Sequence, residues 1–239
     1  MTKHRFFIRR CIELAKKGKG HVSPNPMVGC VITKHGKIIG EGYHKKYGEH
    51  HAEVNAINNV NNKNLLKNAT LYVNLEPCSH TGKTPPCVDL IIKYKISKVI
   101  IGCIDTFKEV NGMGVKKMRD AGIEVITGVL EEESKLLNKR FFVFHGKNRP
   151  YIILKWAETR DGFIAPKKQT KPLWLSSNKS KILVHKWRAE EDAILVGRIT
   201  AEKDNPKLTV REVKGNNPTR IIIDNKLKLS NNLNIFNQD

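Results

Sequence analysis

The chain reads His51-Ala52-Glu53 and, further on, Pro77-Cys78 and Pro86-Cys87. A catalytic zinc ion typically has three protein ligands and keeps a fourth position for water, and one imidazole with two thiolates meets that number. Glu53 would then stay free to move protons. The pattern therefore predicts that His51, Cys78 and Cys87 bind Zn²⁺ and that Glu53 is the catalytic residue. The competing interpretation, a buried histidine and two unrelated thiols, leaves the Ala-Glu and Pro-Pro-Cys context unexplained.

A histidine, any residue and a glutamate ahead of two cysteines is the order found in zinc deaminases, where the glutamate carries protons and is not a ligand. Those enzymes have two residues between the cysteines, whereas this chain has eight, Ser79 to Pro86. A loop of that length can bring its ends close together, so the wider spacing permits a shared ion. It indicates, however, a different family.

The spacing of His51 and Glu53 constrains the local structure. Within a helix, residues two apart point to nearly opposite sides, so both can serve one site only if His51 stands at the start of a helix. Cys87 precedes a second helical stretch, and the dipole favours a thiolate at the amino-terminal end of a helix. We expect the ligands to lie at such helix starts.

The ten-residue segment Cys78-Ser79-His80-Thr81-Gly82-Lys83-Thr84-Pro85-Pro86-Cys87, with Asn25-Pro26-Met27-Val28-Gly29 and the His-Ala-Glu motif before it, resembles the bifunctional riboflavin-biosynthesis deaminase/reductases. The resemblance covers essentially the whole chain. It implies an α/β fold: a three-layer cytidine-deaminase-like sandwich over residues 1–146, then part of a dihydrofolate-reductase-like α/β domain over residues 151–239. In that family the first domain deaminates a diaminopyrimidinone ribosyl phosphate, and the second reduces the ribosyl chain with NADPH.

The resemblance also implies binding residues. For the deaminase substrate these are Asn25, His44, His80 and Lys83; for the reductase substrate, Arg188, Leu208 and Arg211; for NADPH, Trp174, Thr200, Asp204 and Asn225. Some have structural alternatives, since Asn25 before a proline also suits a turn. Two features depart from the family. Asp105-Thr106-Phe107-Lys108 stands where Asp-Pro-Asn-Pro is usual, and the later cofactor segment would lie beyond Asp239, so we expect a shortened reductase domain.

The charge is strongly positive, with 43 Lys and Arg against 23 Asp and Glu and a formal net charge of +20. Such a charge favours anionic partners. The lysines are nevertheless spread along the chain among asparagines, and no basic run alternates with aromatic residues that could stack on bases. We therefore expect a phosphorylated small molecule as the partner and no nucleic acid, while a homo-oligomer stays open.

Five cysteines, at positions 11, 30, 78, 87 and 103, form no disulfide-framework spacing, which favours a reduced state. Cys11, Cys30 and Cys103 are best interpreted as small packed side chains. Apolar runs such as Val99 to Cys103 fall far short of the roughly 20 residues of a membrane-spanning helix. The first residues do not read as a signal peptide, so we expect a cytoplasmic location and no membrane partner.

Hydrophobic periodicity predicts the elements. In the first domain we expect helices at 3–17, 51–60, 88–94, 115–121 and 131–140, and strands at 28–33, 37–42, 70–75, 98–103 and 124–127. After a linker at 146–150 we expect a strand at 151–157, a helix at 178–189 and strands at 193–196 and 220–224. Such alternation favours an α/β architecture.

Two other functions stay open. A zinc deaminase acting on tRNA adenosine or a cytosine nucleotide would share the metal chemistry and suit the positive charge, but the short cysteine spacing is expected there. Alternatively, the ion would only stabilise the fold of a partner-binding module. The intact Glu53 argues against that second alternative.

Overall fold

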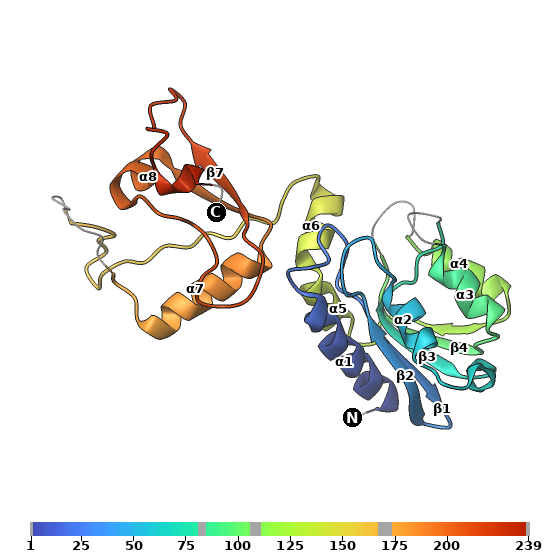
Figure 1. Cartoon of the computed structure of the whole chain (residues 1–239). Coiled ribbons are helices and arrows are strands. Elements are labelled where there is room, and N and C mark those ends of the chain that lie inside the picture. Colours follow the sequence, from blue (N-terminus) through green and yellow to red (C-terminus); the bar gives the residue numbers. More distant parts are fainter. Residues whose placement is uncertain (1, 81–84, 106–110, 167–173, 238–239) are drawn as a thin grey trace. The chain divides into compact units, whose positions relative to one another are not determined.

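The structure is a computed structural model that describes residues 2–80, 85–105, 111–166 and 174–237 (Figure 1). The chain divides into two compact units, Met1–Ile152 and Ile153–Asp239. Among the described residues, no helix combines the length and apolar character needed to span a lipid bilayer.

The first unit is built on a five-stranded sheet in the order β2-β1-β3-β4-β5. The strands are β1 (Gly29–Lys34), β2 (Lys37–Tyr43), β3 (Thr70–Leu75), β4 (Lys98–Cys103) and β5 (Glu124–Ile126). Strand β1 pairs antiparallel with β2 and β3, whereas β3, β4 and β5 run parallel. His35 and Gly36 both have positive φ, which is typical of a two-residue hairpin turn between β1 and β2.

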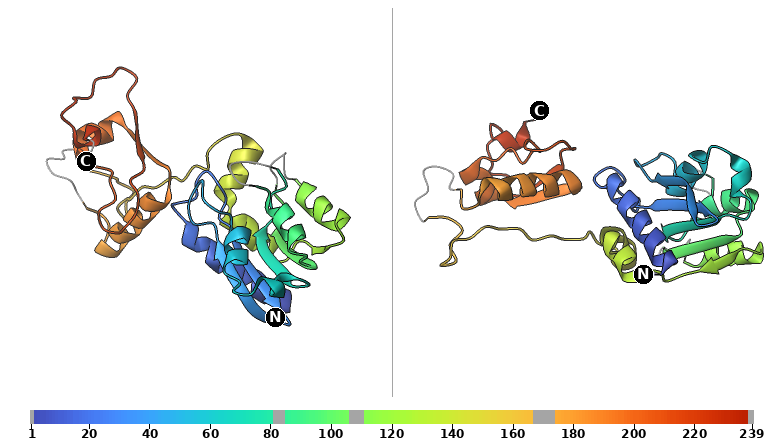
Figure 2. Two further views of the ribbon diagram at one scale, coloured as in Figure 1. Left: turned by 45° about the vertical axis from the view of Figure 1, so that its right-hand side comes forward. Right: turned by 90° about the horizontal axis from the view of Figure 1, so that it is seen from below.

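Helices cover both faces of this sheet, so the predicted three-layer sandwich is confirmed (Figures 1 and 2). Helix α1 (Lys3–Ala15) packs on one face, where Ile8 and Cys11 meet the sheet residues Val31 and Tyr72. On the other face lie α2 (Ala52–Asn58), α3 (Cys87–Lys93) and α4 (Met113–Asp120). Two 3₁₀ helices, η1 (Lys16–Gly18) and η2 (Lys63–Leu66), complete this part.

Close packing holds α2 against β2. Strand β2 and helix α2 approach so closely at Gly42 that a Cβ there would lie 2.3 Å from the backbone nitrogen of Ala56. Helix α3 follows the loop that leaves the carboxyl end of β3, the side of an α/β sheet where ligands usually bind. The starts of α2 and α3, at His51 and Cys87, lie in one region of the first unit.

The predicted helix at 131–140 is wrong in extent, because two helices occupy this region. Helix α5 (Glu131–Leu137) ends before Asn138, and α6 (Lys139–Lys147) follows it, so the first two residues of the expected linker at 146–150 are helical. The break falls at the buried Asn138, whose φ of −103° and ψ of 24° depart from helical values. Its side chain bonds the backbone of Met27, which holds the residue at this point of the structure.

The second unit contains α7 (Asn178–Glu190), β6 (Ala193–Gly197), α8 (Arg198–Asp204), β7 (Thr219–Ile223) and the 3₁₀ helix η3 (Asn234–Phe236). Strands β6 and β7 pair in parallel. One face of the pair packs on a small core that contains Ala201, Leu208 and Ile235. On the other face Leu195 and Ile223 remain more than half exposed.

The predicted strand at 151–157 is wrong, and the segment has no regular secondary structure. A strand needs a neighbour for its backbone hydrogen bonds, and no described strand pairs with it. The apolar side chains of Ile152, Leu154 and Trp156 are accordingly exposed. Residues 151–157 have the amino-acid composition of a strand, but composition alone does not provide a strand for them to pair with.

Candidate metal centre

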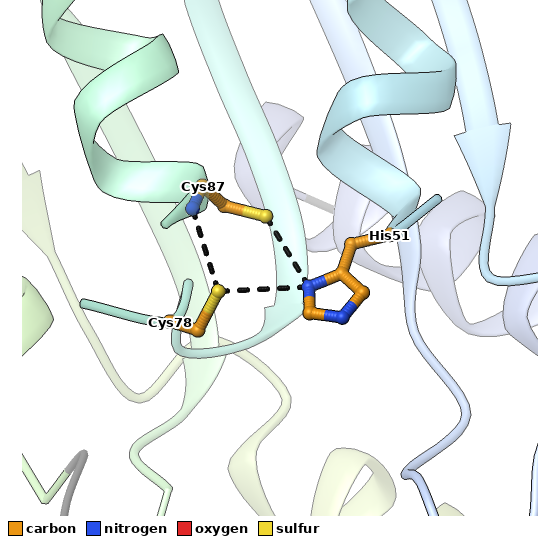
Figure 3. A group of neighbouring side chains, drawn as sticks. All are labelled: His51, Cys78 and Cys87. Carbon is orange, nitrogen blue, oxygen red and sulfur yellow. Dashed lines mark hydrogen bonds between the residues drawn. The ribbon is translucent and has the colours of Figure 1, made fainter. Parts of the chain in front are cut away.

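His51, Cys78 and Cys87 meet at one point of the first unit (Figure 3). The Nδ1 atom of His51 lies 3.5 Å from Sγ of Cys78 and 3.4 Å from Sγ of Cys87, and all three donor atoms lie within 4.8 Å of one another. Bonds of about 2.3 Å to sulfur and about 2.0 Å to nitrogen place such donors roughly 3.6 Å apart around a tetrahedral zinc ion. The donor set therefore fits Zn²⁺, as the sequence predicts.

Helix starts position these ligands. His51 is the N-cap of α2 and has extended backbone angles, which confirms the predicted helix start. Cys87 is the first residue of α3, and its backbone N–H donates to Sγ of Cys78 at 3.4 Å. Both sulfurs thus lie at the amino-terminal end of α3, where the helix dipole favours negative charge.

The two thiols titrate as a pair. Hydrogen bonding to Cys87 lowers the pKa of Cys78 to about 4, whereas the interaction with Cys78 and burial raise the pKa of Cys87. One proton therefore leaves the pair readily and the second is held, until a divalent cation takes its place, because a coordinating thiol is deprotonated. The hydrogen bond to Cys78 also raises the pKa of His51.

Glu53 lies in the first turn of α2, and its side chain is almost fully buried. It lines the same cavity as His51 and Cys78, but it is not among the three clustered donors. Burial raises the pKa of its carboxyl group. A carboxyl group with a raised pKa exchanges protons nearer to neutral pH, as a general acid and base must.

Asn25 and His44 hold each other at the wall of this cavity, whose volume is about 360 Å³. Nε2 of His44 lies 3.1 Å from the amide nitrogen of Asn25, and Nδ1 lies 3.1 Å from the carbonyl oxygen of His50. A carbonyl only accepts, so Nδ1 carries the hydrogen and Nε2 accepts from Asn25. The resulting neutral imidazole agrees with its pKa, which burial lowers. His44 is buried here and not solvent-exposed.

His80 also lines the cavity, whereas Lys83 lies outside the described residues, as do Thr106, Phe107 and Lys108. Asp105, which precedes them, is buried at the cavity wall.

Sequence reasoning missed Glu76, which follows β3 and is 4% exposed. Its carboxylate accepts from the backbone N–H groups of Gly112 at 3.0 Å, Val115 at 3.1 Å and Asp105 at 3.3 Å. It thereby fixes the start of α4 beside the cavity that it lines. The available signal was an acidic residue between an apolar strand and the Pro-Cys pair. Sequence reasoning also missed the cavity-lining side chains of α6.

The residues expected to bind the reductase substrate gather around Thr209 in the second unit. Its carbonyl oxygen accepts from Nη1 of Arg188 at 2.6 Å and from Nη1 of Arg211 at 3.2 Å, which brings the two guanidinium groups together. Leu208 is buried with φ 55°. The Nδ1 atom of His185, another residue that sequence reasoning missed, accepts from the backbone N–H of Arg211 at 3.0 Å.

The four residues expected at NADPH are all exposed. Thr200 and Asp204 belong to α8, and Asn225 follows β7. Trp174 precedes α7 and has the ammonium group of Lys181 5.7 Å from its ring centroid.

Two family models match different parts of the chain. The model of the cytidine and deoxycytidylate deaminase zinc-binding region matches residues 1–103, and that of the RibD C-terminal domain matches residues 150–239. The riboflavin biosynthesis protein RibD of Aquifex aeolicus is 46% identical over 234 residues, which are 98% of this chain and 65% of that protein.

Two solved structures are similar over the whole chain. A diaminohydroxyphosphoribosylaminopyrimidine deaminase/5-amino-6-(5-phosphoribosylamino)uracil reductase from Thermotoga maritima has a TM-score of 0.92 and 48% identity, over 99% of this chain and 67% of that chain. Acinetobacter baumannii RibD has a TM-score of 0.91 and 36% identity, over 98% and 66%. The chain thus spans about two thirds of the length of these relatives.

The matched zinc-binding region contains all three clustered ligands, so His51, Cys78 and Cys87 form a zinc site of the deaminase type. The fold is a cytidine-deaminase-like α/β domain followed by part of a dihydrofolate-reductase-like domain.

Proposed function

Because this chain belongs to the RibD family of bifunctional riboflavin-biosynthesis proteins, we propose that its first unit catalyses the zinc-dependent hydrolytic deamination of a diaminopyrimidinone ribosyl phosphate. The observation that carries the proposal is the position of Glu53, buried at the cavity that His51 and Cys78 also line. We assign the deaminase to residues 1–146 and a reductase-like part to 151–239, in a cytoplasmic protein whose partner is a small molecule.

In this reaction Glu53 accepts a proton from water as the water oxygen bonds to the amino-bearing ring carbon. Glu53 then delivers a proton to the amino group, the carbon–nitrogen bond breaks and ammonia leaves. A bound zinc ion supplies Lewis acidity, which lowers the pKa of water toward neutrality.

Asn25 orients the ring in the proposed complex. One amide hydrogen is directed at His44, and the second hydrogen and the amide oxygen can pair with a pyrimidinone edge, which offers an acceptor and a donor. His44 fixes the amide because its other ring nitrogen is bonded to the backbone of His50. His80 and Lys83 are proposed to contact the phosphate or a ring oxygen.

The test is ammonia release by the purified, zinc-loaded chain from the diaminopyrimidinone ribosyl phosphate, from cytidine and from a tRNA anticodon stem. Turnover of the first compound alone supports the proposal. Turnover of cytidine or the tRNA stem alone would assign the chain to another deaminase class. A protein with stoichiometric zinc and no turnover would instead favour a structural ion.

For the second unit we propose binding roles, with Arg188, Leu208 and Arg211 on the substrate side and the guanidinium groups at the substrate phosphate. The support is the pair of guanidinium groups gathered at the Thr209 carbonyl, since guanidinium forks match phosphate oxygens. The proposed NADPH contacts are Trp174, Thr200, Asp204 and Asn225. A fluorescence titration of the full chain with NADPH tests them: saturable micromolar binding that Asp204→Ala weakens supports the assignment, and no binding at millimolar NADPH ends it.

A further inference from the structure

Helix α6 carries the aromatic sequence Phe141-Phe142-Val143-Phe144-His145, yet none of its residues is buried. Phe141, Phe144 and His145 instead line the cavity beside the zinc ligands. The His145 ring centroid lies 4.4 Å from that of Phe141 and 5.2 Å from that of Phe144, so the three rings form one group, called here the aromatic wall. Apolar side chains that line a cavity and stay out of the core are typical of ligand sites.

The aromatic wall is held in a fixed place relative to another part of the cavity lining, the segment from Pro24 to Val28, called here the rim. Oδ1 of Asn138, just before α6, accepts from the backbone N–H of Met27 at 2.8 Å, and its Nδ2 donates to the Met27 carbonyl at 2.9 Å. The amide of Asn74 donates to the same carbonyl at 3.1 Å. Buried amides with both polar atoms bonded fix the elements that they join.

The cavity therefore has two kinds of lining. Around the metal ligands it presents polar groups, among them Glu53 and Asn25, and along α6 it presents aromatic rings. A flat ring that is held at its edge by hydrogen bonds also gains from contact between its face and an aromatic side chain. A pyrimidine whose amino-bearing carbon is directed toward Glu53 has this combination of edge and face.

We propose that the aromatic wall is the surface on which the pyrimidine ring of the substrate packs, with Phe144 and His145 as substrate-packing residues and Asn138 as the positioning residue that holds α6 beside the rim. This inference rests on the proposed function, because it names the part of the substrate that α6 recognises.

The test is equilibrium binding to the zinc-loaded full chain in a Glu53→Gln background, where turnover does not interfere. The ligands are the diaminopyrimidinone ribosyl phosphate and cytidine monophosphate. Phe144→Ala should raise the Kd of whichever pyrimidine binds by about five- to tenfold, the loss expected for one aromatic contact, and Phe144→Tyr should restore it. Phe6→Ala is the matched control, because Phe6 is 56% exposed on α1, outside the cavity lining, and Phe144 is 49% exposed.

Asn138→Ala should weaken binding of the same ligand, and its effect should not add to that of Phe144→Ala, since both act through one wall. Additive effects would show that Asn138 has only a structural role and would overturn its assignment. An unchanged Kd in Phe144→Ala at full zinc content would overturn the proposed role of the aromatic wall. The proposal would also be overturned if neither pyrimidine bound to the chain. The proposed function fails separately, if the wild-type chain releases no ammonia from the diaminopyrimidinone while Phe144→Ala still weakens cytidine monophosphate binding.

Discussion

The Sγ atom of Cys87 lies 3.4 Å from Nδ1 of His51, and these residues are the first residue of α3 and the N-cap of α2. Two helices therefore begin at the zinc site (Figure 3). Their dipoles both favour negative charge there. The arrangement joins metal binding to the packing of the helical layer.

Cys78→Ala and Cys87→Ala should each reduce bound zinc from one equivalent to near none, because two protein ligands do not hold a catalytic zinc ion. Metal analysis of freshly purified protein is the measurement. Cys103→Ala is the matched control: Cys103 is also buried but lies outside the cluster, so this variant should keep its zinc. Full zinc occupancy in Cys87→Ala would contradict the ligand assignment.

Glu53→Gln should keep the zinc and lower kcat by roughly 10²–10⁴-fold, the usual contribution of a positioned general acid and base. Steady-state ammonia release and metal content are measured on the same sample. Glu49→Gln makes the same chemical change at another residue that lines the cavity, and kcat should fall by less than about threefold. A Glu53→Gln variant with wild-type kcat would show that another group carries the proton.

Glu76→Gln should lower the free energy of unfolding by about 2–3 kcal/mol, because an amide group would replace one oxygen that now accepts backbone N–H bonds in a buried position. Urea unfolding measures the change. Glu124→Gln is the control: this side chain is 60% exposed and paired with Lys98, so its removal should cost under about 1 kcal/mol. Equal losses of unfolding free energy in the two variants would contradict the role of Glu76 in fixing the start of α4.

Glu41 gives a pH-dependent prediction. The Arg10 guanidinium bonds both of its oxygens, at 2.8 and 2.9 Å, and holds the pKa of Glu41 below its usual value. A lowered carboxyl pKa contributes stability above the unfolded-state pKa, and that stability is lost as the pH falls through the folded-state pKa. Glu41→Gln should therefore cost about 1 kcal/mol at neutral pH and progressively less in acid.

The matched control for Glu41 is Asp120→Asn, which removes one partner of the more exposed ion pair between Lys116 and Asp120 and should change stability by under about 0.5 kcal/mol. Unfolding free energies are compared at neutral pH and near pH 3. A Glu41→Gln penalty that grew in acid would contradict the assigned sign.

Sequence predicts best where the determining residues are neighbours in the chain. Strands β3 and β4 fall at the predicted positions because short apolar runs between turn residues are typical of buried strands. The metal ligands were predictable because zinc restricts the number and type of donors. The break at Asn138 was not, since it depends on Met27, 111 residues away. The absent strand at 151–157 shows the same limit, because pairing requires another segment.

A single ion on His51, Cys78 and Cys87 would connect chain positions 27 and 36 residues apart. Such a connection is a cross-link. For loops of this size, chain-entropy arguments predict that a covalent cross-link stabilises the folded state by about 3–4 kcal/mol. It needs no oxidising surroundings, unlike a disulfide. Removal of zinc by a chelator should thus take from the first unit a cross-link as well as a Lewis acid, and the unfolding temperature of this unit should fall. The unfolding temperature of the second unit, which supplies none of the three ligands, should stay unchanged.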